Sequence, residues 1–341
     1  MMKLMKALAL GLAIAAPAAH ADTLIDERFD DADLAARGWY DLKGVSLSST
    51  DFSSAPSAME FRFAPGALVP DAAGMRRQFA ETDSVYLSYR VTYADNWVGS
   101  GQPHHPHLFY LLTNADDAWT GPAETRLTVY AEAVGGRMKL SLQDSRNIDQ
   151  NRIDQDLTGI TENRSVAGCN GSADATAGQC YKAGSGYRNV KEWNAPEVSF
   201  GDAPGANYKA DWHQVEAFVR LNSVSDGKGI ADGVLQLWVD GQLLIDRHDV
   251  LLRTGQHPDM KFNQLVLGPY IGDGSPIDQT FWIDDVVLAT ATPVAAEVVE
   301  TVPVEVPSEV PSEVPAVAED SPLIDQLFWA GGIYQPFGGS L

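Results

Sequence analysis

Three of the seven histidines of this chain, His104, His105 and His107, lie within four residues in the segment PHHPH. An imidazole titrates near neutral pH, so it can give or take a proton without a large shift of its pKa. The two prolines exclude a helix, which places these histidines on a loop. Three interpretations stay open: a loop that lines a cleft, ordinary structural or surface histidines, and a metal site, for which the segment fixes no ligand geometry.

Other residues that could bind a substrate or take part in catalysis alternate along two neighbouring segments, ETRLTVYAEAV and RMKLSLQDS. Side chains of a strand alternate between its two faces, so Thr128, Tyr130 and Glu132 share one face of the first segment. Lys139, Ser141 and Gln143 share one face of the second. Gly135-Gly136 joins the segments and predicts a hairpin. Polar and aromatic residues in this pattern are typical of a sugar-binding sheet, and also of a plain solvated sheet.

Strands dominate the chain, and the densest series runs from residue 211 to residue 288. Four runs there alternate apolar and polar residues with a period of two: DWHQVEAFVRLNS, DGVLQLWVDGQLLI, MKFNQLVLGPYIG and QTFWIDDVVLA. Asp240-Gly241 supplies a tight hairpin turn inside the second run. We expect an antiparallel meander. Earlier strands are predicted from the runs LIDERF, SAMEFRFAP and SVYLSYRVTYA.

The order of Asn222, DGVLQLWVDG and the final FWIDDVVL resembles the C-terminal half of concanavalin A-like jelly rolls. That group includes secreted polysaccharide lyases, glucanases and laminin-G-like binding domains. The resemblance implies an all-β fold, a two-sheet antiparallel jelly-roll sandwich. Glucanases of this fold carry a Glu-x-Asp-x-x-Glu type of motif with paired carboxylates. The sequence has no such motif and Glu132 stands alone, so a retaining glycosidase is disfavoured.

Jelly-roll lyases act on uronate polymers by β-elimination, which needs a proton-transfer pair and a group that neutralises the carboxylate. RLTVYAE resembles the Arg-containing strand of alginate lyases, and NQLVLGPYIG resembles their Tyr-containing strand, although their Tyr-Phe-Lys-Ala-Gly and Gln-Ile-His motifs are absent. Residues of types that suit these tasks are the catalytic candidates His105, His107, Tyr130, Tyr270 and Arg126. The substrate-binding candidates are Gln143, Lys139, Arg220, Trp238 and Gln264.

Two non-enzymatic alternatives remain: a carbohydrate-binding or adhesion module, and a structural surface protein. Sugar rings stack on exposed aromatic side chains, and five tryptophans are candidates for such a surface: Trp39, Trp97, Trp119, Trp193 and Trp238. Aromatic residues of a sandwich are more often part of its core.

A structural calcium ion is a further expectation, at the first and last strands. These strands commonly lie side by side in jelly rolls of this group, which would bring Asp26, Glu27 and Asp285 together next to Asp284. Clustered carboxylates repel one another unless a cation intervenes, and Ca²⁺ takes oxygen ligands. The chemistry itself requires no cofactor.

The N-terminus predicts export. Lys3 and Lys6 precede an apolar run, and Ala-His-Ala at 19–21 fits a signal-peptidase site, so residues 1–21 are predicted to be a signal peptide. The protein would be secreted, periplasmic or held at the cell surface. No segment reaches the roughly 18 apolar residues of a membrane span. The formal net charge of −22 disfavours a nucleic-acid partner, and a polyanionic polysaccharide would need a local group of cations.

The predicted jelly-roll domain covers residues 22–291, and the composition changes abruptly after it. Residues 292–320 repeat Glu-Val-Pro units without Lys or Arg, which predicts a disordered, Pro-stiffened acidic linker. Residues 321–341 are apolar and aromatic, with Gly and Pro that exclude a membrane helix. This tail is expected to bind a surface partner or to fold back as a strand.

Cys169 and Cys180, the only cysteines, lie in a polar segment that has few apolar residues to hold it in place. In an exported protein such a pair is expected to form a disulfide. Peptide mapping of exported protein without reductant should find the two cysteines linked. Two free thiols in that map would contradict the prediction.

Overall fold

The computed structural model describes residues 21–49, 57–72, 74–113, 118–119, 121, 125–143, 192–255 and 257–292. The predicted signal peptide, both cysteines, the acidic linker and the apolar tail lie outside these ranges, so those predictions stay predictions. The described residues form strands, turns and irregular segments, and none of them is in a helix. Accordingly, no described helix could cross a membrane.

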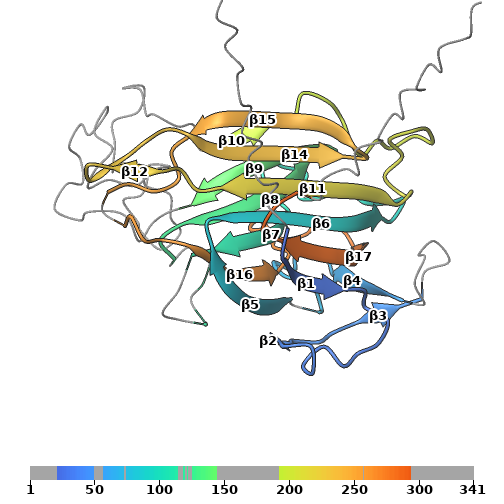
Figure 1. Cartoon of the computed structure of the whole chain (residues 1–341). Coiled ribbons are helices and arrows are strands. Elements are labelled where there is room, and N and C mark those ends of the chain that lie inside the picture. The colour runs from blue at the N-terminus through green and yellow to red at the C-terminus, as the bar shows by residue number, and fades with distance from the viewer. Residues whose placement is uncertain are drawn as a thin grey trace, which may run out of the picture. The chain divides into compact units, whose positions relative to one another are not determined.

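One antiparallel sheet has eight strands, in the order β15-β14-β11-β6-β17-β4-β3, with β1 also paired to β17 (Figure 1). Its strands are β1 (Thr23–Glu27), β3 (Leu47–Ser48), β4 (Ala58–Phe63), β6 (Ser84–Tyr93), β11 (His213–Arg220), β14 (Gly233–Val239), β15 (Gln242–Val250) and β17 (Gln279–Ala289).

The second antiparallel sheet has seven strands, in the order β10-β9-β8-β7-β16-β5-β2. Its strands are β2 (Trp39–Tyr40), β5 (Met75–Thr82), β7 (His107–Leu112), β8 (Thr128–Val134), β9 (Arg137–Gln143), β10 (Glu192–Asn194) and β16 (Phe262–Leu267). A separate two-stranded ribbon joins β12 (Val224–Ser225) to β13 (Lys228–Gly229).

The two sheets pack face to face around one apolar core. In β6, Val85, Leu87, Tyr89 and Val91 all point into this core and are at most 1% exposed. Tyr89 meets Phe109 of the other sheet edge to face, with ring centroids 5.9 Å apart. The period-two pattern of the sequence therefore marks the inner face of each strand, and the fold is the predicted all-β two-sheet antiparallel sandwich.

Several predicted strands are confirmed. The hairpin through Gly135-Gly136 joins β8 to β9, and Asp240-Gly241 joins β14 to β15. Asp240 and Gly241 both have positive φ, of 49° and 76°, as a tight hairpin turn of this kind requires. The first and last strands are neighbours, since β1 pairs with β17.

The predicted meander is right only in part. β11, β14 and β15 are adjacent, but β16 belongs to the seven-stranded sheet and β17 lies between β6 and β4. The alternation of apolar and polar residues shows which face of a strand is buried, but it does not show which strand lies beside it. β5 is also a strand that we did not predict, and β7 begins at His107, inside the segment that we expected to be a loop.

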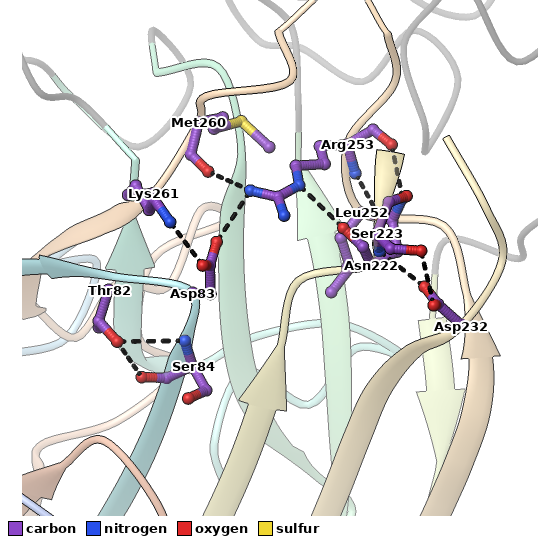
Figure 2. Close-up of polar contacts among 10 residues, drawn as sticks. All are labelled: Thr82, Asp83, Ser84, Asn222, Ser223, Asp232, Leu252, Arg253, Met260 and Lys261. Atoms are coloured by element: carbon purple, nitrogen blue, oxygen red, sulfur yellow. Dashed lines mark hydrogen bonds and ion pairs between the residues drawn. The ribbon is translucent and has the colours of Figure 1, made fainter. Parts of the chain in front are cut away.

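A polar network holds the two connections that cross between the sheets (Figure 2). Asn222 is fully buried, and its Oδ1 accepts the backbone N–H groups of Leu252 and Arg253, each at 2.7 Å. The guanidinium of Arg253 donates to the Asn222 carbonyl at 2.8 Å and to Asp83 at 2.9 Å. Asp83 stands in the β5–β6 turn and also binds Lys261, which precedes β16. The network thus fixes where β16 enters its sheet.

Replacing Asn222 by Ala should destabilise the fold by about 2–4 kcal/mol, because the buried N–H groups of Leu252 and Arg253 would lose their acceptor. Urea denaturation followed by tryptophan fluorescence measures this change. As a control, Asn96→Ala removes an exposed side chain with one hydrogen bond to the Asp278 carbonyl, and it should cost less than about 1 kcal/mol. Equal losses in the two variants would contradict the role given to Asn222.

Candidate functional site

The outer face of the seven-stranded sheet, on the side away from the core, concentrates side chains that can move protons or bind a carboxylate. The strands contribute them at alternate positions, and a small apolar cluster of Tyr110, Leu112, Tyr130 and Val266 lies among them. Neighbouring strands bring the following residues onto this face: Arg76, Gln264, His107, Tyr110, Tyr130, Glu132, Lys139, Gln143 and Glu192.

His107 is held between two partners. Its Nε2 lies 2.8 Å from Oε1 of Glu132, which pairs with it across β7 and β8. Its Nδ1 lies 2.8 Å from the hydroxyl of Tyr110 on the same strand. A carboxylate can only accept, so Nε2 carries a proton and the neutral ring accepts the Tyr110 O–H at Nδ1. Glu132, His107 and Tyr110 thus form a continuous hydrogen-bonded chain.

Glu132 is paired with two basic side chains. Its carboxylate is 3% exposed and binds both His107 and the ammonium of Lys139, which is itself 4% exposed. Lys139 also lies 3.3 Å from the half-exposed carboxylate of Glu192. A buried carboxylate is stable only when it is paired, so Lys139 keeps Glu132 ionised and Glu132 in turn orients His107.

His105 stands beside this chain in a defined tautomer. The backbone N–H of Gly272 donates to its Nδ1 at 3.0 Å, so the neutral ring carries its proton on Nε2. Burial, and then the neighbouring His107 and His104, lower the pKa of His105 to about 4. A Cβ at position 272 would lie 2.5 Å from the His105 ring, so glycine is required there. At neutral pH His105 is therefore a neutral hydrogen-bond donor.

Two tyrosines close the group. The ring centroid of Tyr270 lies 5.3 Å from that of His105 and 6.0 Å from that of His107. The ring of Tyr130 lies 4.5 Å from His107. Tyr270 and His107 also exchange backbone hydrogen bonds, which fixes the loop after β16 against the start of β7. Four of the five predicted catalytic residues, His105, His107, Tyr130 and Tyr270, thus converge.

A second group occupies the other end of the same face. Arg76 donates to Gln264 at 3.1 Å and to Asp41 at 2.9 Å. Gln264 binds the hydroxyl of Tyr40, whose ring meets Trp119 edge to face at 5.2 Å. Trp119 is 63% exposed. This end therefore offers a guanidinium, an amide and an exposed aromatic ring.

Two sets of side chains on the histidine loop could hold a metal ion by proximity, with ligand atoms within 4.8 Å of one another: His104, His105 and Asp273, and His105, His107 and Glu132. A metal-binding histidine carries its proton on the nitrogen that does not touch the metal. His105 receives a backbone N–H at Nδ1, which leaves the proton on Nε2. Both nitrogens of His107 are engaged as well, so the arrangement suits proton transfer better than metal binding.

The other predicted site residues lie elsewhere. Arg220 and Trp238 are on the outer face of the eight-stranded sheet, across the sandwich from the histidines. Arg126 precedes β8, and its charge, after burial, contributes to the lowered pKa of His257. Trp39, Trp97 and Trp193 are core residues, because the inner face of each strand needs large apolar side chains.

The predicted calcium residues have other partners in the structure. Glu27 is 2% exposed and binds Arg37 and the indole of Trp39, both at 2.8 Å. Asp26 is exposed beside Arg28, and Asp285 lies 3.9 Å from Arg90. The pairing of β1 with β17 that motivated this site is present, and calcium itself stays a prediction.

Sequence reasoning missed Tyr110 and Arg76. Tyr110 follows His107 by three residues, and a bulge in β7 between them turns both side chains to the same face. Arg76 lies on β5, which was not predicted as a strand. An outward arginine on the segment MRRQF was the available signal for that strand.

No family model matches the chain, and no curated protein matches it. The solved structures that resemble it include polysaccharide lyases. An alginate lyase from Aplysia kurodai is 14% identical, with a TM-score of 0.49, and the match covers 79% of this chain and 100% of that one. An alginate lyase from a Chlorella virus is 11% identical, with a TM-score of 0.47 and coverage of 79% and 99%.

An endo-β-1,4-glucuronan lyase from Trichoderma reesei is 13% identical, with a TM-score of 0.44 and coverage of 78% and 94%. These values are too low to transfer the chemistry of any of these enzymes to this chain.

The low pKa of His105 makes a prediction about acid stability. The unfolded chain takes up a proton on this residue below its ordinary pKa of about 6.5, whereas the folded protein takes it up only near 4. Its contribution to stability is thus complete above about pH 6.5 and is lost as the pH falls to 4. In urea denaturation, the free energy of unfolding of the parent should fall between pH 7 and pH 4.5. In His105→Gln this fall should be smaller by about 1–2 kcal/mol. An equal decrease in the free energy of unfolding in both proteins would contradict this account.

Proposed function

We propose that this protein is an exported polysaccharide lyase that cleaves an acidic, uronate-containing polysaccharide by β-elimination. One observation carries the proposal. A single sheet face holds both a proton-transfer group, built on Glu132, His107, Tyr110, His105 and Tyr270, and a donor-rich end at Arg76 and Gln264. β-Elimination on a uronate needs these two functions on the same substrate chain.

The reaction sets the requirements. A base removes the proton on the carbon next to the uronate carboxylate. The bond from the neighbouring carbon to the glycosidic oxygen breaks, a carbon–carbon double bond forms, and the leaving oxygen takes up a proton. The carbon acid is weak, so a hydrogen-bond donor must hold the carboxylate while negative charge develops on it.

The chain offers a residue for each of these tasks. His105 is neutral and presents an N–H, which suits it to hold the carboxylate of the sugar that reacts. Tyr270 is half-buried against both histidines and serves in proton transfer to or from the substrate. His107, held by Glu132 at Nε2, accepts the hydrogen bond of the Tyr110 hydroxyl at Nδ1, in the way that an imidazole oriented by a carboxylate activates a hydroxyl in hydrolases.

The Arg76 end serves to bind the polymer. Gln264 and Tyr270 are six residues apart, so at most about 20 Å of extended chain separates the two ends of the face. That length accommodates several sugar units. The guanidinium of Arg76 can bind a second uronate carboxylate, and the exposed ring of Trp119 can stack on a sugar. Arg76 is paired with Asp41, so this end offers a polyanion charge-assisted hydrogen-bond donors rather than a net positive charge.

A carbohydrate-binding module is the second candidate. The observation in its favour is the 63% exposure of Trp119, because an exposed aromatic ring is a surface on which a sugar can stack. Such a module would retain the polysaccharide without cleaving it. Chromatography of the protein on immobilised polysaccharide, with the recovered polymer examined for unsaturated ends, separates the two candidates.

Replacing Tyr270 by Phe should lower turnover roughly 100-fold or more, since one hydroxyl that transfers a proton is lost while the packing of the ring is kept. Tyr110→Phe should lower turnover by a similar factor if the Glu132–His107 pair acts through it. The assay follows the ultraviolet absorbance of the unsaturated product on a panel of uronate polysaccharides.

Control variants lie on the opposite sheet. Arg220→Ala and Trp238→Phe change two residues that the sequence predicted to bind substrate and that lie across the sandwich, and both variants should keep full turnover. Full turnover in both tyrosine variants would reject the assignment of the site. A parent protein that binds a polysaccharide and releases no unsaturated product would replace the lyase with the binding module.

A further inference from the structure

A buried glutamine stands at the first position of β17, in the eight-stranded sheet. Gln279 is 1% exposed and lies opposite Phe63 of β4. Two loops meet at its side chain: the histidine loop, residues 94–106 between β6 and β7, and the Tyr270 loop, residues 268–278 between β16 and β17. A buried amide lowers stability unless its donors and acceptors are bonded, so its partners show what it holds in place.

The amide of Gln279 uses all four of its hydrogen-bonding positions. Its Oε1 accepts the backbone N–H groups of Val98 at 2.9 Å and Gly99 at 3.1 Å. Its Nε2 donates to the Gly99 carbonyl at 2.7 Å and to the Ser275 hydroxyl at 2.6 Å. Glutamate has no donor, and methionine has neither a donor nor a strong acceptor, so only the amide satisfies all four groups.

On the histidine loop, the amide binds next to the residues that hold the histidines. Gly99 has a φ of 63°, and a Cβ there would lie 3.3 Å from the ring of Pro106, which follows His105. Ser100 is 6% exposed, and its hydroxyl donates to the carbonyl of His104. A displacement of Gly99 therefore reaches the histidines through a ring contact and a hydrogen bond.

On the Tyr270 loop, the amide binds a buried serine. Ser275 is 2% exposed, and its hydroxyl donates in turn to the carbonyl of Ile277 at 2.8 Å. Three residues before Ser275, the N–H of Gly272 donates to Nδ1 of His105 at 3.0 Å. The bond that fixes the tautomer of His105 thus joins the two loops, and both loops are bound to one amide.

Backbone hydrogen bonds hold both loops independently of the amide. In the Tyr270 loop, the N–H of Ser275 donates to the carbonyl of Ala67 at 2.9 Å. In the histidine loop, the N–H of Ala94 donates to the carbonyl of Thr280 at 3.0 Å. Loss of the amide should therefore leave the loops folded and shift them relative to each other. A shift of about 1 Å in a catalytic group can lower a rate roughly 100-fold.

We infer that Gln279 is a positioning residue of the candidate site, whose amide sets the distance between the histidine loop and the Tyr270 loop. Because it is 1% exposed, it cannot touch a substrate, and it acts through His105 and Tyr270. Its effect on the His105 ring follows from the geometry alone, whereas its effect on turnover rests on the proposed lyase function. The site on one sheet thus depends on a side chain of the other.

Gln279→Met tests the inference, because it keeps the length of the side chain and removes its hydrogen bonds. In the parent, burial and the neighbouring imidazoles lower the pKa of His105 to about 4, so its ring should be neutral at about pH 5.5. In the variant the Gly272 N–H should leave Nδ1 and the ring should be more solvated, so its pKa should rise toward the ordinary value of about 6.5. NMR of the full-length protein with ¹⁵N-labelled histidine measures this protonation, and His105→Gln identifies the signals.

Ser275→Ala gives a second, milder test. The change removes the link to the Tyr270 loop and leaves both bonds of the Gln279 Oε1 intact. The pKa of His105 should rise in the same direction, by less than in Gln279→Met. One lost hydroxyl destabilises the fold less than the loss of a fully bonded amide, so this variant tests the inference even where Gln279→Met does not fold.

Val219→Ala is the control for stability. Val219 is fully buried and pairs with Val85 at one end of β6, whereas Phe281, two residues after Gln279, pairs with Tyr93 at the other end. The loss of two buried methyl groups should lower the melting temperature. The titration of the histidine ring should stay as in the parent.

Turnover adds a second measurement on any uronate polysaccharide that the parent cleaves. Gln279→Met should lower kcat roughly tenfold or more and leave KM within about twofold, since the polymer-binding end at Arg76 is not changed. Val219→Ala should keep both constants at a temperature where it is folded.

Two results would overturn the inference: an unchanged titration of His105 in both Gln279→Met and Ser275→Ala, or an equal change in Val219→Ala. The titration uses no substrate. A parent that cleaves no polysaccharide would therefore reject the proposed function without deciding whether Gln279 positions His105, which the titration decides.

Discussion

The candidate site depends on one buried carboxylate. Glu132 lies in the middle of a sheet, where an unpaired charge would be unstable, and it is held there by the Lys139 ammonium and the His107 imidazole. Removing Lys139 would leave the buried charge of Glu132 uncompensated. The same pairing fixes the tautomer of His107 and so determines that its second nitrogen faces Tyr110. The ion pair with Lys139 and the orientation of the His107 ring thus both depend on a single residue of β8.

The sequence predicted which face of each strand is buried and which strands form hairpins, but not the order of the other strands in the two sheets. Thr128, Tyr130 and Glu132 were predicted to share a face, as were Lys139, Ser141 and Gln143, because alternation is a local property of an extended chain. The order of strands depends on where long connections cross, and the connection after β15 takes β16 into the other sheet. That crossing is held by Asn222 and Arg253, which are 31 residues apart in the sequence. No local pattern indicates such a contact.

The site was predictable to a similar extent. Residue types capable of proton transfer identified His105, His107, Tyr130 and Tyr270, and the sandwich brings them together. Arg220 and Trp238 fitted the expected chemistry equally well as types, yet they point to the opposite side of the molecule. The role of Tyr110 required a bulge in β7 that changes which positions face outward, and a bulge shifts the register of side chains without a clear mark in the sequence.

The position of β17 has a consequence for how the chain reaches this structure. β17 is the last strand of the sandwich, and it pairs with β6, β4 and β1. Until residues 279–289 are available, β6 and β4 have no strand between them and β1 has no partner in its sheet. Contacts between the two ends of a chain form late, because a long loop must close first. The eight-stranded sheet therefore assembles after the whole domain has been synthesised, and a chain that stops before β17 cannot form it.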